Sequence, residues 1–283
     1  MENLKKRIRQ LKEKRPGYAD ILDFYEKVKE AQENTKASLT VAPIQPKEES
    51  KSLLTKPGSP LLRKEYFSID VEASVALFQS LCQIGKKANP HMAERVSKIE
   101  EVISGKTIDL KKLLREGGKE EKIEKIAEGS GLDRKVLSFL IHNSRKPSIE
   151  AEVEHIRAEI DPEKWMKGHC PICGSPPDLS LLKEEVGKRY LVCSYCRCQW
   201  RVERLLCPFC DNREPNSLHY LFGEEEEAFR IDLCEKCHQY IKTIDLRIIE
   251  PPDPSLEDLA TLHLDILASQ KGYKRPVPNF WLP

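Results

Sequence analysis

The sequence predicts an α+β protein in which an N-terminal all-α helical domain is followed by two tandem small metal modules and a C-terminal helix. Three observations predict this order. Apolar residues recur at helical spacing through much of the first 163 residues. Nine of the ten cysteines fall between Cys170 and Cys237, where short β-type runs replace the helical pattern. A final apolar segment with helical spacing follows Pro251, Pro252 and Pro254.

Composition and charge describe a globular chain with balanced charges. Hydrophobic residues make up 39% and charged residues 33% of the 283 residues, and 47 basic against 46 acidic residues leave a net charge of +1. A nucleic-acid-binding protein normally carries a basic excess or a basic patch. The N-terminal segment MENLKKRIRQLKEKRPGY lacks the apolar stretch of a secretory signal, and no run approaches the ~18 apolar residues of a membrane helix. We therefore expect a cytoplasmic protein without membrane insertion.

Three segments make up the N-terminal part. We expect helices within residues 1–35, where apolar residues follow helical spacing. Residues 36–65 contain four prolines among Ser, Thr and Lys, a composition that indicates an extended connection. Residues 66–163 predict a helical domain made of successive short helices. Two of these are expected to be separate helices, with the sequences DRKVLSFLIHNS and SIEAEVEHIRAEI.

Four CxxC pairs carry the chemistry of the sequence, and spacers of 19, 10 and 23 residues separate them. A CxxC turn directs two thiolates at one ion, and a tetrahedral site needs two such turns. In a cytosolic chain, clustered cysteines indicate metal ligands rather than disulfides. Pairing the turns in sequence predicts a first site of Cys170, Cys173, Cys193 and Cys196 and a second site of Cys207, Cys210, Cys234 and Cys237.

An internal repeat favours this sequential pairing, although a cross-braced arrangement of the first pair with the third stays open. The first copy is CPICGSPPDLSLLKEEVGKRYLVCSYC and the second is CPFCDNREPNSLHYLFGEEEEAFRIDLCEKC. Each copy has a CPxC turn, an apolar strand, a charged tip, a second strand and a closing CxxC, which is typical of a zinc ribbon or rubredoxin-like module. We place these modules at residues 164–204 and 205–250, and the C-terminal helix and tail at 251–283.

The donor set limits what the two sites can do. Four thiolates suit iron or zinc, and the ligand spacing does not separate these metals. Protein sulfurs fill all four coordination positions of each metal, so no position is left for an activated water. We therefore expect that the protein is not an enzyme. Residues 164–250 hold 13 Lys and Arg against 14 Asp and Glu, and the thiolates add negative charge, which disfavours phosphate binding. A nucleic-acid-binding zinc ribbon is therefore only the third alternative.

A few residues outside the eight ligands also carry expectations. Three interpretations of Cys198 stay open: a strand residue packed near the metal, a spare ligand, or a reactive thiol. Cys82 is expected to be a small core residue on a helix. Ser255 and Asp258 have the S-x-x-D spacing of a capping box and predict the start of the final helix.

Five segments in a fixed order carry a resemblance to a known family. They are GSPLL at 58–62, the stretch from Trp165 through GHCPICGSPP at 165–177, GKRYLVCSYCRCQWRVERLLCPFC at 187–210, CEKCHQYIKTID at 234–245, and EDLATLHLDILASQKGYKRPVPN at 257–279. With this series the chain resembles the formate dehydrogenase accessory protein family, FdhE. Four of the segments lie within residues 165–279, about 40% of the chain, and the four CxxC pairs carry over onto the eight cysteines named above.

The resemblance implies a helical N-terminal domain, two rubredoxin-like modules that hold iron, and a cytoplasmic location. It also implies that the protein is required for the activity of respiratory formate dehydrogenase, an enzyme of molybdenum or tungsten, selenium and iron–sulfur clusters whose catalytic subunit is exported folded. The implied partner is that catalytic subunit. The alternative function is a rubredoxin-like electron-transfer protein acting on the same partner.

Overall fold

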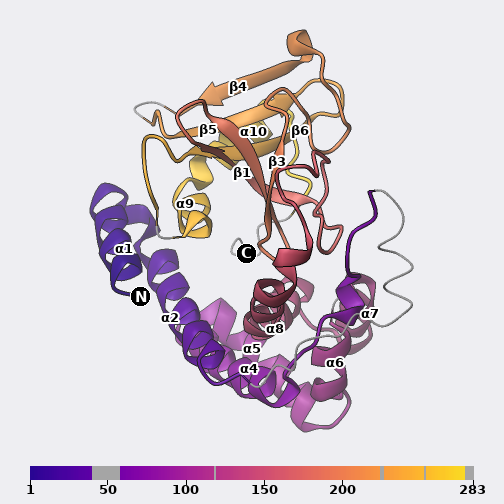
Figure 1. Ribbon diagram of the computed structural model, residues 1–283. Coiled ribbons are helices and arrows are strands. Elements are labelled where there is room, and N and C mark those ends of the chain that lie inside the picture. The colour runs from indigo at the N-terminus through magenta and orange to yellow at the C-terminus, as the bar shows by residue number, and fades with distance from the viewer. Residues whose placement is uncertain (40–57, 118, 224–225, 252, 278–283) are drawn as a thin grey trace. The chain divides into compact units, whose positions relative to one another are not determined.

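The chain is described here by a computed structural model that covers residues 1–39, 58–117, 119–223, 226–251 and 253–277 (Figure 1). It divides into two compact units. In the described residues, the first unit comprises 1–39 and 63–155, and the second comprises 58–62 and 156–277. The first unit is helical and the second contains a sheet and both cysteine clusters, which confirms the α+β class. Most of the connection expected at 36–65 lies outside the described residues.

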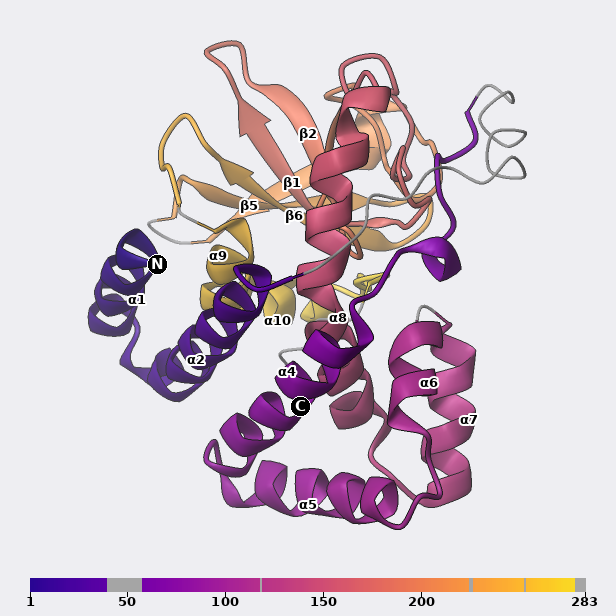
Figure 2. The same cartoon turned by 60° about the horizontal axis from the view of Figure 1, so that its bottom comes forward.

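Seven α-helices build the described part of the first unit, and Figure 2 shows them from below. Helix α4 is central, because it contacts α2, α5 and α6. Its apolar face, including Leu77, Phe78 and Leu81, is buried in a core cluster of this unit. None of the described helices is long and apolar enough to cross a membrane. The helices are α1 (Glu2–Lys14), α2 (Ala19–Lys36), α4 (Val71–Lys86), α5 (Pro90–Ser104), α6 (Leu110–Glu116), α7 (Glu120–Ser130) and α8 (Arg134–Ile156).

Polar side chains fix where several helices begin. Asp70 Oδ1 accepts from the backbone N–H of the third residue of α4 over 3.0 Å, and Asn89 Oδ1 does the same for α5 over 2.9 Å. Asp109 caps α6 in the same way over 3.0 Å. Such side chains satisfy backbone donors that have no partner inside the helix. The first turn of each helix is therefore specified locally.

The two helices expected around residue 147 form one continuous helix, α8, so that expectation is wrong. Pro147 lies inside α8 and has no N–H to donate to the carbonyl of Asn143, four residues earlier. Gln32 of α2 supplies the missing donor, because its Nε2 lies 3.1 Å from that carbonyl oxygen and 3.0 Å from Asn143 Oδ1. A tertiary hydrogen bond thus replaces the one that proline removes.

The second unit is built on one six-stranded sheet with the strand order β3-β2-β1-β6-β5-β4. Strands β1, β2 and β3 pair antiparallel, and so do β4, β5 and β6. The two halves join where β1 runs parallel to β6, with Leu181 opposite Ile244. The two repeats therefore share a continuous sheet. The strands are β1 (Pro177–Lys183), β2 (Lys188–Cys193), β3 (Gln199–Val202), β4 (Leu218–Phe222), β5 (Phe229–Cys234) and β6 (Gln239–Asp245).

The C-terminal segment forms two short helices, α9 (Pro254–Ala260) and α10 (Leu262–Gln270), where a single helix was expected. Helix α10 packs on β5, and Leu264 and Ala268 join the core on that face of the sheet. The backbone between the two helices departs from helical geometry at Thr261, where φ is −122° and ψ is 37°. The hydroxyl of Thr261 donates to the carbonyl of Glu257 over 2.7 Å.

The predicted capping box at the start of this segment is also wrong. Asp253 caps α9, because its Oδ1 accepts from the N–H of Ser255 over 2.9 Å. Asp258 instead lies 2.6 Å from Lys242 Nζ and 2.9 Å from Arg275 Nη2. Burial alone would raise the pKa of Asp258, but the two cations outweigh burial and hold that pKa well below its usual value. Asp258 therefore ties α9 to β6 and to the C-terminal tail.

Candidate metal centres

All four CxxC turns close in the same way, through the residue that follows the second cysteine. Its backbone N–H donates to the carbonyl of the first cysteine over 2.9–3.2 Å. At this residue the backbone has the left-handed conformation, which lets the chain reverse tightly. This conformation is strained for most residues that carry a Cβ atom and unstrained for glycine. The four turns thus share one backbone geometry. The closing residues are Gly174, Arg197, Asp211 and His238, with φ values of 71°, 60°, 55° and 54°.

The first sulfur group forms between the turn before β1 and the turn after β2. Cys170 Sγ lies 3.6 Å from Cys196 Sγ, and Cys173 Sγ lies 3.3 Å from Cys193 Sγ. All four cysteines are buried. Backbone N–H groups of Cys173 and Cys196 point at the sulfurs of Cys170 and Cys193 over 3.5 and 3.4 Å. These donors favour the thiolate form that binds metal.

The second sulfur group forms between the turn that follows Leu206 and the turn between β5 and β6. Cys207 Sγ lies 3.7 Å from Cys237 Sγ, and Cys210 Sγ lies 3.7 Å from Cys234 Sγ. Cys207 and Cys234 are buried, whereas Cys210 and Cys237 are partly exposed. The second group is therefore nearer to solvent than the first.

Both groups fit a metal ion bound by four thiolates. Within each group, all four sulfurs lie within 4.8 Å of one another. A metal–sulfur distance of about 2.3 Å places the sulfurs of a tetrahedron about 3.8 Å apart. The closest sulfur pairs, at 3.3–3.7 Å, approach that edge and are longer than a disulfide bond of about 2.05 Å. The structure brings the cysteines together in the sequential arrangement rather than the cross-braced one, and the geometry suits either iron or zinc.

Each group contains a cysteine that ionises more readily than a free one. Burial opposes a charge on Cys173, but hydrogen bonds with neighbouring sulfurs, first that of Cys170, outweigh burial and lower the pKa of Cys173. Burial also opposes a charge on Cys234. Hydrogen bonds from the N–H of Cys237 and the side chain of Asn212 outweigh it and lower the pKa of Cys234 to about 7.

The two remaining cysteines lie outside these groups. Cys198 is 8% exposed, and its Sγ lies 3.7 Å from the carbonyl oxygen of Gln199 at the start of β3. It is buried next to the first group without joining its four sulfurs. Cys82 lies in the helical core, where burial raises the pKa of its thiol to about 12.

The segment 58–62 supports the first CxxC turn, a contact that the sequence did not predict. Leu61 N–H donates to the carbonyl of Pro171 over 2.9 Å, and Leu62 N–H donates to the carbonyl of Ile172 over 2.7 Å. Both carbonyls belong to the two residues that lie between Cys170 and Cys173. Composition marked this segment as an irregular connection, and composition carries no information about pairing partners. The GSPLL motif thus holds the backbone of a metal-binding turn.

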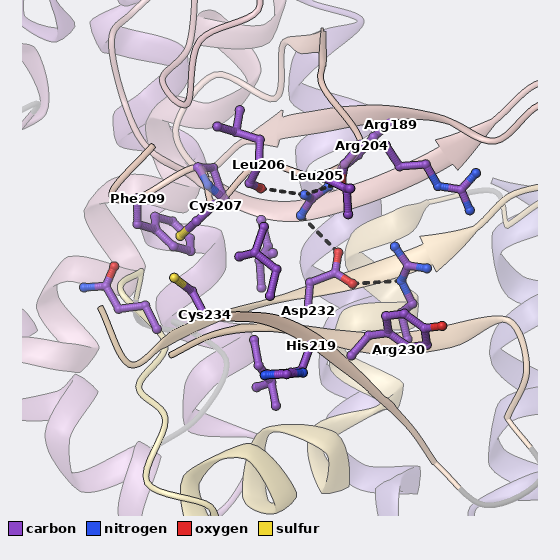
Figure 3. A pocket seen from close by; sticks show the side chains of 16 residues that line it. Arg189, Arg204, Leu205, Leu206, Cys207, Phe209, His219, Arg230, Asp232 and Cys234 are labelled. Atoms are coloured by element: carbon purple, nitrogen blue, oxygen red, sulfur yellow. Dashed lines mark hydrogen bonds and ion pairs between the residues drawn. The ribbon is translucent and has the colours of Figure 1, made fainter. Parts of the chain in front are cut away.

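A cavity of about 160 Å³ opens beside the second group (Figure 3). Cys207 and Cys234 line it, and Arg189, Asp232 and Arg230 form part of its wall. The Asp232 carboxylate lies between the two guanidinium groups, 3.0 Å from Arg189 Nη2 and 2.8 Å from Arg230 Nε. These charged groups are paired with one another, so this side of the cavity is a structural junction between β2 and β5.

Two family models match the part of the chain that contains both sulfur groups. The model described as FdhE, central domain, matches residues 169–204, and the model described as FdhE, C-terminal domain, matches residues 205–282. Each model contains one complete four-cysteine group. The helical unit lies outside both matches.

Relatives named for the same family match the chain over different lengths. Protein FdhE homolog of Aquifex aeolicus is 29% identical over 278 residues, which cover 97% of this chain and 92% of that protein. Protein FdhE homolog of Stutzerimonas stutzeri is 38% identical over 117 residues, which cover 40% of this chain and 38% of the relative. Protein FdhE of Escherichia coli is 35% identical over 121 residues, which cover 40% and 37%.

A solved structure extends the similarity through the helical unit. The crystal structure of the FdhE protein from Pseudomonas aeruginosa superposes with a TM-score of 0.71 at 26% identity, and the match covers 99% of this chain and 94% of that one. The structural similarity therefore covers the helical unit as well as the sheet. Taken with the two family models, it shows that the chain is similar to FdhE proteins along almost its whole length.

Proposed function

We propose that the chain is a cytoplasmic accessory factor required for the activity of formate dehydrogenase, and that it acts by binding the catalytic subunit of that enzyme. Similarity to FdhE proteins supports the accessory role. The proposal that the chain acts by binding rests on one observation: protein sulfurs supply four donors at each of two sites. Such closed sites stabilise small folds and leave no position for an activated water. The proposed role is therefore binding of the catalytic subunit and not catalysis.

The two metal ions, iron or zinc, act in this proposal as cross-links between turns. Each four-cysteine group joins the ends of two strands of the same half-sheet. The strands pack on a buried cluster of their own that includes Leu181, Ile231 and Ile244, so metal binding is proposed to fix the CxxC turns rather than to fold the whole sheet. Loaded sites keep the loops and strand ends in the arrangement that contacts the catalytic subunit.

Paired cysteine variants in the native host test this proposal. Changing Cys193 and Cys196 to serine is expected to remove one metal ion per chain and to abolish formate dehydrogenase activity. The catalytic subunit should co-purify with the unmodified chain and not with the variant. Cys82→Ala is the matched control, because it removes a buried thiol while leaving both sulfur groups intact. Full enzyme maturation by the double variant would contradict the proposal.

Electron transfer is the second candidate function, and the exposure of the second site favours it. Cys210 and Cys237 are partly exposed, so an electron could reach a metal at this site from the surface. The function requires iron, because zinc has no redox chemistry. Metal analysis and a visible spectrum of protein purified without oxygen separate the two functions. A colourless protein that holds only zinc and still matures its client would exclude electron transfer.

Nucleic-acid binding is not part of the proposed function. The two metal modules carry no basic excess, and their thiolates add negative charge. A binding assay with DNA and RNA at low salt should therefore detect no complex, since phosphate affinity depends on released counterions.

A further inference from the structure

Ser175 and Asn212 occupy equivalent positions in the two metal sites. Each follows the left-handed residue that closes a CPxC turn, and each is nearly fully buried, with 1% and 3% of its surface exposed. Their backbones make the same contact: the Ser175 carbonyl accepts from the N–H of Cys170 over 2.9 Å, and the Asn212 carbonyl accepts from the N–H of Cys207 over 2.8 Å. The internal repeat therefore presents a buried polar side chain at the same place in both sites.

Both side chains contact a sulfur of their own site. Ser175 Oγ lies 3.2 Å from Cys173 Sγ. Asn212 Nδ2 lies 3.5 Å from Cys234 Sγ, on the opposite turn of the second site. A metal-bound cysteine is a thiolate, which accepts hydrogen bonds and has no proton to donate. With a metal bound, Ser175 and Asn212 must therefore be the donors.

The orientation of the Asn212 amide is fixed by two other contacts. Its Oδ1 accepts from the N–H of Glu214 over 3.2 Å, and its Nδ2 donates to Ser217 Oγ over 2.7 Å. Because Oδ1 already faces a donor, the amide cannot turn its oxygen toward the sulfur without losing that bond. The second proton on Nδ2 is thus directed at Cys234.

We propose that Ser175 and Asn212 are positioning residues of the two metal sites, each donating a hydrogen bond to one metal-bound thiolate. Outer-sphere donors of this kind orient the ligand and spread its negative charge, and their loss typically costs on the order of 10–100-fold in metal affinity. The first site uses a hydroxyl and the second uses an amide. The two residues therefore give the two sites different ligand fields although the eight ligands are identical in kind.

Competition for Zn²⁺ with a chromophoric chelator tests the proposal on the full chain. The Cys196→Ser and Cys237→Ser variants identify which phase of metal release belongs to which site. Asn212→Ala is expected to weaken the second site by roughly 10–100-fold and to leave the first unchanged. Ser175→Ala should do the reverse. Asn216→Ala is the control, because Asn216 is an exposed residue of the same loop.

Asn212→Asp separates hydrogen-bond donation from a role in shaping the turn. Aspartate keeps the oxygen that accepts from Glu214 N–H, but it replaces the donor to Cys234 by a second carboxylate oxygen. The proposal expects affinity at the second site to fall in the order Asn, Ala, Asp, and expects the sulfur-to-metal band of the Co²⁺ form to shift. If the Asp variant binds as tightly as the Ala variant or tighter, Asn212 only shapes the turn and the proposal is overturned. Unchanged affinity in Asn212→Ala and Ser175→Ala would overturn it as well.

Discussion

Arg189 Nη2 lies 3.0 Å from Asp232 Oδ2 and joins β2 to β5 across the centre of the sheet. Arg189 is buried, and its guanidinium also donates to the carbonyl of Leu206 over 2.7 Å and to Ser180 Oγ over 2.9 Å. Asp232 also accepts from Thr243 Oγ1 over 2.7 Å. One side chain thus connects both half-sheets and the segment between them.

Removing this arginine should be among the more damaging single changes in the second unit. Arg189→Ala removes the buried donor to the Leu206 carbonyl and leaves Asp232 with Arg230 as its remaining cation. Breaking a buried pair costs about 3 kcal/mol in the free energy of unfolding. Urea unfolding followed by circular dichroism measures this loss. Arg213→Ala is the control, because the Arg213–Glu203 pair is about half exposed and is worth at most about 1 kcal/mol. Equal effects of the two variants would contradict the role assigned to Arg189.

Glu152 makes the stability of the helical unit depend on pH. Its side chain is 1% exposed, and burial raises its pKa to about 7, although the N–H of Ser68 donates to Oε2 over 2.7 Å and acts in the opposite direction. Above a pH of about 4.5 the unfolded chain ionises first, so stability falls as pH rises toward 7 and stays low above it. The full loss is about 3 kcal/mol.

Glu152→Gln should remove this pH dependence. The variant is expected to gain stability over the unmodified chain at pH 8 and to show little difference at pH 4, as measured by urea unfolding at both values. Glu94→Gln, at an exposed position of α5, serves as the control and should not change the pH profile. An equal stability difference at both pH values would show that folding does not raise the pKa of Glu152.

Metal removal should separate the behaviour of the two units. Both units have a buried apolar cluster, but only the second contains turns that the sulfur groups hold together. After treatment with a strong chelator, amide hydrogen exchange should increase sharply at the four CxxC turns and change little in residues 71–104. An equal loss of protection in both regions would mean that metal binding stabilises the whole chain together.

The left-handed residue at His238 is a sensitive position for the second site. His238 has φ of 54°, and its N–H donates to the Cys234 carbonyl over 2.9 Å. His238→Gly should match or exceed the unmodified chain, because glycine adopts this conformation without a steric cost of about 1 kcal/mol. His238→Val should reduce Zn²⁺ affinity at the second site only, as measured by chelator competition. Similar Zn²⁺ affinities for the Gly and Val variants would show that the left-handed backbone at residue 238 does not control metal binding.

The features that the sequence predicted best are those that depend on residues close together in the chain. The CxxC spacing and the repeat identified the sulfur groups because the geometry of each turn is local. The continuous helix through Pro147 was missed because it depends on Gln32, which lies 111 residues from Asn143. The parallel pairing of β1 with β6 was missed for the same reason, since nothing near Leu181 encodes a partner at Ile244. Ser175 and Asn212 gave no signal, because a polar residue after a turn is usually exposed.

The β1–β6 pairing has a consequence for how this protein can be divided in the laboratory. The boundary between the two family models, after residue 204, passes between two halves that share backbone hydrogen bonds. A fragment ending there keeps all four cysteines of one site and yet exposes the edge of β1, a hydrophobic strand with unpaired backbone groups. Such fragments are expected to associate with themselves. The smallest piece that keeps this pairing is therefore the whole sheet with its two C-terminal helices.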